Sequence, residues 1–166
     1  MNQKQIKNRI LRPAVILLSI TLAAVTSGCY VSKKRDYDSA KFTYSTNRDG
    51  TLTITGVDKG GNDIDAIKVP RTIDGKTVTV IGKSAFSQSV HVGGDEKYLV
   101  VLPDTIVKIE RWAFSSSSII DITIPDSVAE IEEEAFSNTG LKNVSVPRNA
   151  KIADKAFSDS VNITYR

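Results

Sequence analysis

A short phrase that recurs along the chain constrains the fold more than any other feature of the sequence. The segments IERWAFSSSS at 109–118 and IEEEAFSNTG at 131–140 are nearly alike and stand 22 residues apart. IGKSAFSQS at 81–89 and IADKAFSDS at 152–160 carry the same Ala-Phe pair. Recurrence at such a period is typical of repeat architectures, in which each unit packs against the next. The sequence therefore predicts a solenoid.

A proline that ends a short run of β-branched residues is the second landmark of each unit. In the copy IDITIP, Ile122 and Ile124 alternate with polar residues, as in a strand that buries one face. Pro125 ends this strand because proline has no backbone N–H to donate. The landmark recurs at Pro70, Pro103, Pro125 and Pro147. We therefore predict that each strand hydrogen-bonds to its copy in the next coil.

The apolar residues on the return path of each coil predict one shared core. In one unit these are Val128, Ile131 and Phe136, and Ala135 is small enough to let neighbouring coils approach. A single unit carries too few apolar side chains to close a core. Stacked units can close one, with each Phe lying over the Phe of the next coil.

The segment 41–57 predicts a different element at the start of the repeats. Two alternating runs flank the turn-forming residues Asn47–Gly50, which is typical of a β-hairpin. Repeat arrays need a terminal cap, because the outermost coil otherwise leaves its apolar face in water. We therefore assign residues 41–57 to a hairpin cap and residues 58–166 to the repeats.

The first 28 residues carry the pattern of an export signal. Four basic residues precede the apolar run AVILLSITLAAV at 14–25, which is too short to span a bilayer, and small residues follow it. VTSGC, which ends at Cys29, resembles the lipobox of bacterial lipoproteins, where the thiol is acylated after cleavage. The alternative is an ordinary secretory signal whose cysteine is incidental. Residues 29–40 are polar and predict a tether between lipid and fold.

The charge of the chain argues against nucleic acid as a partner. The whole chain has 22 basic and 19 acidic side chains, but the signal segment holds four of the basic ones, which leaves 18 against 19. No basic run remains beyond KKR at 33–35, whereas nucleic-acid-binding domains present a basic patch. Cys29 is the only cysteine, so an intrachain disulfide is excluded.

Two long stretches carry a family resemblance. The segment 53–86, TITGVDKGGNDIDAIKVPRTIDGKTVTVIGKSAF, and the segment 124–147, IPDSVAEIEEEAFSNTGLKNVSVP, resemble the BspA-like, or Treponema-type, bacterial surface leucine-rich repeats. The usual phrase of that family is close to IPxSVxxIGxxAFxxCxxLxxI, and the likeness covers roughly residues 42–166. The resemblance implies a mainly β leucine-rich-repeat solenoid. It also implies short parallel strands on the concave face, short turns or 3-10 segments on the convex face, and an N-terminal β-hairpin cap.

Departures from the family phrase concern the turns. The glycine that follows isoleucine is present as Gly82, but Glu110, Glu132 and Ala153 replace it in the other units. Residues with a side chain avoid positive φ, so we predict that those turns avoid it as well.

A search for catalytic residues finds no convergent set of titratable groups. His91 is the only histidine and stands without an evident partner in the insertion HVGGDE. The acidic run EIEEE at 130–134 flanks Ile131, and we expect its glutamates to face water rather than to form a catalytic pair. We therefore expect no enzyme activity, no metal and no cofactor.

The outward positions of the strands form two columns that are candidates for recognition. One column is Ala66, Leu99, Asp121, Asn143 and Asn162, and the other is Lys68, Val101, Thr123, Ser145 and Thr164. Leu99 and Val101 are apolar where most of their equivalents are polar. Trp112, the sole tryptophan, fills a slot that holds Ser84, Glu134 and Lys155 in other units.

Exposed apolar and aromatic side chains often anchor protein partners. We therefore name Leu99, Val101, Trp112, Asp121, Thr123, Asn143 and Ser145 as partner-binding residues. The alternative is that Trp112 covers its own turn and that Leu99 packs under the insertion at 91–97.

Together these features predict a surface-exposed lipoprotein of the bacterial cell envelope. We expect it to be held in the membrane through Cys29 and its solenoid to bind another protein. The family resemblance implies that this protein belongs to a host surface, which would be adhesion, or to the envelope. Two alternatives stay open: a surface protein that binds glycans, which would need aromatics in a line, and a subunit of an envelope assembly.

Overall fold

The computed structural model describes residues 36–37, 41–58, 66–87 and 97–166 of the chain. All of them belong to one unit, Lys33–Arg166. The expected signal segment, Cys29 and His91 lie outside the described residues. Within the expected tether, Asp36–Tyr37 forms a short strand, β1, instead. Among the described residues no helix is long and apolar enough to cross a membrane.

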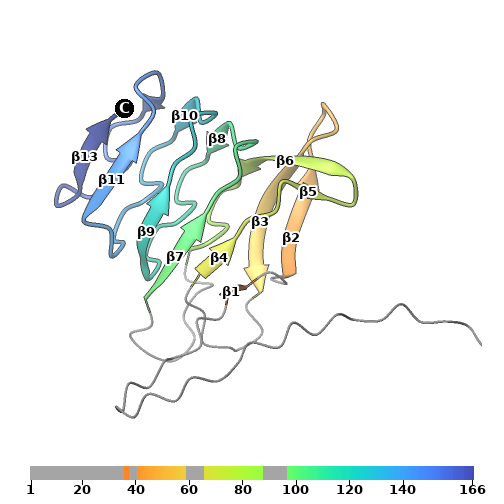
Figure 1. Ribbon diagram of the computed structural model, residues 1–166, viewed down its shortest axis with the longest axis horizontal. Helices are drawn as coiled ribbons and strands as arrows, with labels where there is room; N and C mark the ends of the chain where they lie inside the picture. Colours follow the sequence, from red (N-terminus) through yellow and green to blue (C-terminus); the bar gives the residue numbers. More distant parts are fainter. Residues whose placement is uncertain (1–35, 38–40, 59–65, 88–96) are drawn as a thin grey trace, which may run out of the picture. The chain divides into compact units, whose positions relative to one another are not determined.

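One side of the solenoid is built from short parallel strands, one from each coil. β1 is followed in the sheet by β4 (Ala66–Lys68), β7 (Tyr98–Val101) and β9 (Ile119–Thr123). β11 (Asn143–Val146) and β13 (Asn162–Tyr165) continue this side as a separate parallel pair (Figure 1). We call the outward side of β4, β7, β9, β11 and β13 the strand face.

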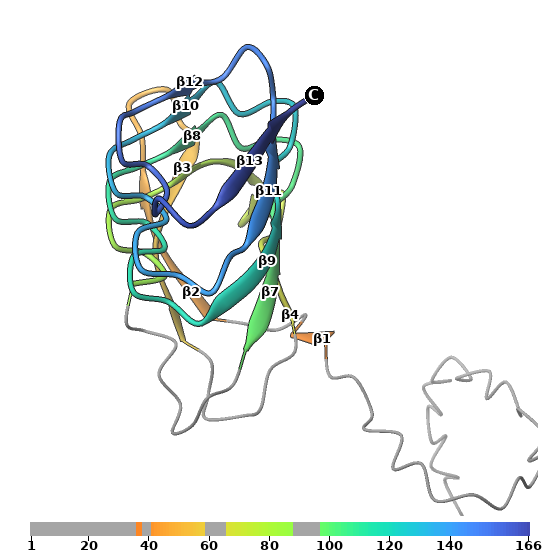
Figure 2. The ribbon, with the colours of Figure 1, turned by 90° about the vertical axis from the view of Figure 1, so that its left-hand side faces the viewer.

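The opposite side carries a second parallel ladder, which differs from the turns or 3-10 segments expected there. It runs from β6 (Lys76–Ile81) through β8 (Lys108–Ile109) and β10 (Glu130–Ile131) to β12 (Lys151–Ile152). Figure 2 shows β8, β10 and β12 stacked in this order. Turns link these strands, and no 3-10 helix occurs in the described ranges. Isoleucine faces isoleucine in the register Ile81, Ile109, Ile131 and Ile152, so each two-residue strand contributes a β-branched residue to its neighbour.

The predicted hairpin is confirmed, and it extends this second ladder. β2 (Lys41–Thr46) and β3 (Leu52–Asp58) pair antiparallel, and β3 pairs parallel with β6. The turn between them closes through a hydrogen bond from Gly50 N to Asn47 O, and Gly50 has a φ of 83°. Another short strand, β5 (Thr72–Ile73), pairs antiparallel with β6. The first coil is therefore joined to the hairpin by backbone hydrogen bonds.

The core is a column of stacked phenylalanines, as the repeat predicts. The ring centroids of Phe86 and Phe114 are 4.7 Å apart, those of Phe114 and Phe136 are 4.9 Å apart, and those of Phe136 and Phe157 are 4.8 Å apart. The alanine before each Phe is buried. At Ala113, Ala135 and Ala156 its carbonyl accepts the N–H of the Phe one coil earlier, as from Phe114 N to Ala135 O at 2.8 Å. Val128 and Ile131 are fully buried, as expected.

The turns after the second ladder do contain positive φ, so the prediction that they avoid it is wrong. The residue with positive φ stands two positions after the family glycine, at Ser84, Trp112, Glu134 and Lys155, with values of 58° to 61°. Its recurrence in four coils shows that the geometry of the turn requires it, at a conformational cost that non-glycine residues rarely accept.

Candidate interaction surfaces

The strand face presents the two predicted columns in register. Leu99 lies between Ala66 and Asp121, and Val101 lies between Lys68 and Thr123. Asn143 pairs with Asn162, and Ser145 with Thr164. Val101 is 41% exposed, and Asp121, Thr123 and Asn143 are exposed, whereas Leu99 and Ser145 are half-buried. Ala66 differs from the expectation, because it is buried where β4 pairs with both β1 and β7.

The strand face is interrupted between β9 and β11, so the prediction that every strand bonds to its copy is wrong there. These two strands lie side by side, but no ladder pair joins them in the described residues. The Arg166 guanidinium bridges the seam at its end, donating to Ile124 O, to Ser145 O and to the Asp126 carboxylate. The polar run is therefore two groups, Asp121 with Thr123 and Asn143 with Ser145, on either side of a seam.

Ile120 adds an apolar residue to this region that the column pattern did not predict. It is 42% exposed, and the β7–β9 register shifts so that Tyr98 faces Ile119 while Leu99 faces Asp121. Ile120 is thus an extra residue in β9, and bulges of this kind re-aim side chains. It borders a cavity of about 410 Å³ together with Lys97, Ser118, Asn138 and Gly140. Two consecutive isoleucines in SIIDITIP break the alternation and were the signal for it.

Trp112 lies on the turn that follows β8, away from the strand face. Its indole N–H donates to Glu134 Oε2 at 3.0 Å. Lys83 Nζ lies 4.9 Å and Arg111 Cζ 4.6 Å from the ring centroid. The side chain is half-buried and joins three successive coils. A ring already in contact with two cations is a poor platform for stacking a sugar.

The glutamates of the run at 130–134 form ion pairs, whereas we expected them only to face water. Lys108 Nζ lies 3.0 Å from Glu130 and 2.6 Å from Glu132, and Arg111 lies 2.8 Å from Glu133. Each basic residue reaches an acidic residue of the next coil, since Lys108 pairs in register with Glu130. We call residues 108–111, 130–133 and 151–153, which lie on β8, β10 and β12 and just after them, the charged ladder.

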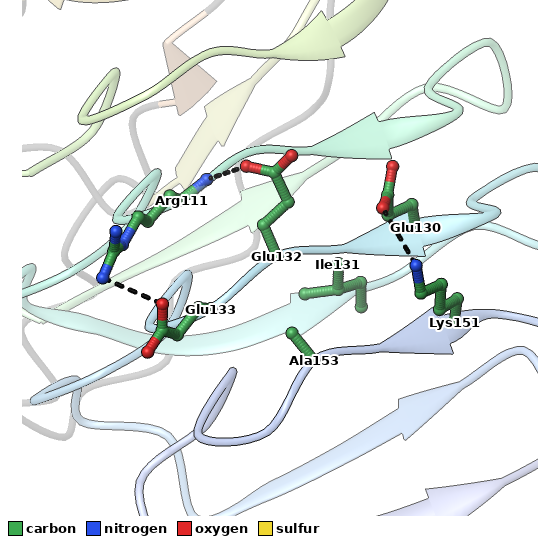
Figure 3. Close-up of a pocket in the computed structure, with 7 residues that line it drawn as sticks. All are labelled: Arg111, Glu130, Ile131, Glu132, Glu133, Lys151 and Ala153. Atoms are coloured by element: carbon green, nitrogen blue, oxygen red, sulfur yellow. Dashed lines mark hydrogen bonds and ion pairs between the residues drawn. The ribbon is translucent and has the colours of Figure 1, made fainter.

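Two glutamates of the charged ladder also accept backbone N–H groups from the coil before. Glu110 Oε2 accepts Lys83 N, and Glu132 Oε2 accepts Arg111 N, each at 2.9 Å. Ala153 holds the equivalent position one coil later and has no carboxylate. A cavity of about 260 Å³ lies there, lined by Arg111, Glu130, Ile131, Glu132, Glu133, Lys151 and Ala153 (Figure 3).

These contacts shift the pKa of both partners at the centre of the charged ladder. Hydrogen bonds from Lys108 lower the pKa of Glu132 below its usual 4.5, although partial burial opposes the shift. Hydrogen bonds to Glu132 and Glu130 raise the pKa of Lys108 above 10.5. Both shifts favour the charged forms, so the pair stabilises the fold at neutral pH.

We expect Glu132→Gln to flatten the loss of stability in acid. A carboxyl whose pKa is lower in the folded chain stabilises it above the unfolded pKa, and this contribution disappears as the pH falls through the folded pKa. Wild type should therefore lose stability steeply from about pH 5 to about pH 3, and the variant less so. At pH 7 the variant should be less stable by about 1 kcal/mol.

Urea denaturation at a series of pH values measures this slope. Asp121→Asn is the matched control, because Asp121 forms no ion pair among the described residues. Equal slopes for Glu132→Gln and wild type would contradict the assignment.

No group of three or more metal-ligating side chains occurs in the described part of the chain.

Burial raises the pKa of Tyr98, the largest fully buried side chain among the described residues, which lies in the core under the strand face. The structure therefore brings together an apolar and polar strand face and, opposite it, a charged ladder with a cavity.

Comparison with known proteins identifies the repeat. A family profile described as "BspA type Leucine rich repeat region" matches residues 64–165 in six copies. The chain belongs to the BspA-type leucine-rich-repeat family. No curated relative matches the sequence.

Solved leucine-rich-repeat structures agree with this assignment. A T. pallidum leucine-rich-repeat protein is 26% identical over 75% of this chain, with a TM-score of 0.61, and the match covers 61% of that protein. A Bacteroides capillosus leucine-rich-repeat protein is 25% identical over 78% of this chain and 99% of its own, with a TM-score of 0.62. The pneumococcal vaccine antigen PcpA, at 23% identity and a TM-score of 0.57, shares the fold.

Proposed function

We propose that this chain is a lipid-anchored bacterial surface protein that binds another protein through its strand face and performs no catalysis. Membership of the BspA-type leucine-rich-repeat family supports a protein-interaction or surface role. The observation that carries the placement is the exposure of Val101 beside Leu99, with polar Asp121 and Thr123 in the next strand. An apolar centre with a polar rim is the arrangement of a protein interface.

Two observations weigh against the alternative of a glycan-binding protein. The indole of Trp112 is held by Glu134, Lys83 and Arg111. The exposed aromatics of the described residues, Tyr44 and Tyr165, lie on β2 and β13, which belong to different sheets and form no line. A subunit of an envelope assembly would have the same strand face, so protease treatment of intact cells separates the two: an outward-facing protein is digested.

We expect the double variant Leu99→Asp, Val101→Asp to lose its protein partner while keeping its thermal transition. Two carboxylates at an apolar centre would have to be desolvated on binding, which costs several kcal/mol. The partner is first captured with wild-type protein from solubilised envelope and from extracellular matrix, and the variants are then compared on that partner by surface plasmon resonance.

Val107→Asp is the matched control, because Val107 is 44% exposed but lies on the opposite side, where its carbonyl accepts the N–H of Ala129. Retained binding in the double variant, with loss on Trp112→Ala, would place the binding surface on the turns instead.

We expect Cys29→Ser to move the protein from the membrane to the soluble fraction or to leave the precursor uncleaved. Acyl chains contribute about 0.8 kcal/mol per buried methylene, and two or more hold a protein stably on a membrane. Fractionation with immunoblotting measures both outcomes. Normal processing together with unchanged membrane retention would exclude lipidation at this cysteine.

A further inference from the structure

A contact that repeats between coils of the charged ladder is missing at Ala153. Glu110 and Glu132 each accept a backbone N–H from the previous coil at 2.9 Å. Ala153 occupies their position, since its N–H donates to Ile131 O as that of Glu132 donates to Ile109 O, both at 2.9 Å. The N–H that a glutamate at 153 would bind belongs to Glu133. It has no hydrogen-bond acceptor among the described residues.

A cavity occupies the place of the missing carboxylate. It measures about 260 Å³ and lies beside Ala153, with Arg111 and Glu133 on one side and Glu130 and Lys151 on the other (Figure 3). The Lys151 side chain is 82% exposed, and its ion pair with Glu130 is long, at 3.9 Å. The cavity therefore offers an unbonded backbone N–H and a weakly engaged ammonium group. Glu132 is held by the same two kinds of donor, from Arg111 N and Lys108 Nζ.

Each of the three carboxylates that line the cavity is already paired with a cation. Glu130 and Glu132 share Lys108, at 3.0 Å and 2.6 Å, and Glu133 pairs with Arg111 at 2.8 Å. A further carboxylate therefore meets mainly the free donors, and charge-assisted hydrogen bonds to an anion are the stronger kind.

We propose that this cavity binds a carboxylate group presented by an aspartate or glutamate side chain of a protein partner. The bound carboxylate completes the series that Glu110 and Glu132 begin. The site lies on the charged ladder, opposite the strand face, so it goes beyond the function proposed above and does not depend on Leu99 or Val101. A side chain from a partner fits because the intramolecular ligands at the equivalent positions are themselves glutamate side chains.

Backbone NMR of the full chain in a zwitterionic detergent tests the site with a defined probe. The capped tripeptide acetyl-Gly-Glu-Gly-amide should move the Glu133 amide proton downfield in a saturable way. Acetyl-Gly-Gln-Gly-amide, which has the same shape without the charge, should not. Absence of a saturable shift, or an equal shift with the glutamine peptide, overturns the proposal. Acetate that binds as tightly as the glutamate peptide overturns the assignment to a protein side chain.

Two variants locate the effect. Ala153→Glu should supply its own carboxylate, so that the Glu133 amide lies downfield without probe and no longer responds. Lys151→Met keeps the backbone donor and should weaken the glutamate peptide about threefold to fivefold, as expected for one exposed ion pair. Lys142→Met, at an exposed lysine before β11, is the control and should leave affinity unchanged. Equal affinities in Lys151→Met and wild type, or a full response in folded Ala153→Glu, contradict the site.

Discussion

Phe136→Ala should destabilise the fold by about 3 to 5 kcal/mol, which is the usual cost of removing a buried phenylalanine. The ring is fully buried and stacks on two others, with centroids 4.9 Å from Phe114 and 4.8 Å from Phe157. Its removal opens a void at the centre of the column, and the solenoid backbone on both sides is held by coil-to-coil hydrogen bonds that limit collapse. Urea denaturation of the Lys33–Arg166 unit measures the change, and a loss below about 1 kcal/mol would contradict a buried column.

A double-mutant cycle separates stacking from simple burial. Phe114→Ala combined with Phe136→Ala should be non-additive, because the two rings touch and the second truncation removes fewer contacts than the first. Phe86→Ala combined with Phe157→Ala is the matched pair, since these rings stack on different partners. Those losses should add within about 0.5 kcal/mol. Equal coupling in both pairs would show that the whole array, and not ring contact, causes the non-additivity.

The sequence predicts the solenoid, the phenylalanine column and the hairpin because each has a periodic pattern of residues. The Ala-Phe pair recurs at intervals of 28, 22 and 21 residues, and Ile122 and Ile124 alternate with polar residues at the end of β9 and just after it. Most of the second ladder could not be predicted, because β8, β10 and β12 are two residues long, too short for alternation to be visible. The positive φ could not be predicted because the residues that adopt it are of different types. Trp112 and Glu134, for example, hold the same turn position, and neither is a glycine.

The candidate surfaces depend on contacts between residues that are distant in the sequence, and the sequence alone does not show these contacts. The outward columns followed from the period of two, but the seam between β9 and β11 depends on how Arg166 reaches Ile124 and Ser145. The acidic run at 130–134 does not itself contain the basic residues that pair with it. Its partners, Lys108 and Arg111, stand about one repeat earlier, so the pairs emerge only when the repeats are aligned and charges are compared down each column. The position of Ala153 becomes informative in the same alignment.

Gly82→Ala should weaken the junction between the hairpin and the first coil by about 1 to 3 kcal/mol, the usual cost of overpacking. Gly82 is absent from the residues with positive φ, so close approach and not backbone freedom explains the glycine. A Cβ there would lie 2.6 Å from Ile54 O and 2.8 Å from Thr53 Cγ2. The carbonyl belongs to β3 and accepts the Gly82 N–H at 2.8 Å, so the strand cannot move away without losing that bond. Hydrogen exchange should therefore accelerate at β3 and β6 before it does at β10.

Gly140→Ala is the graded control, because its nearest contacts would be 3.0 Å and the strain correspondingly smaller. Unchanged stability and exchange in Gly82→Ala would mean that β3 moves away from the added Cβ at no cost. The close contact between the hairpin and the first coil would then not stabilise the fold.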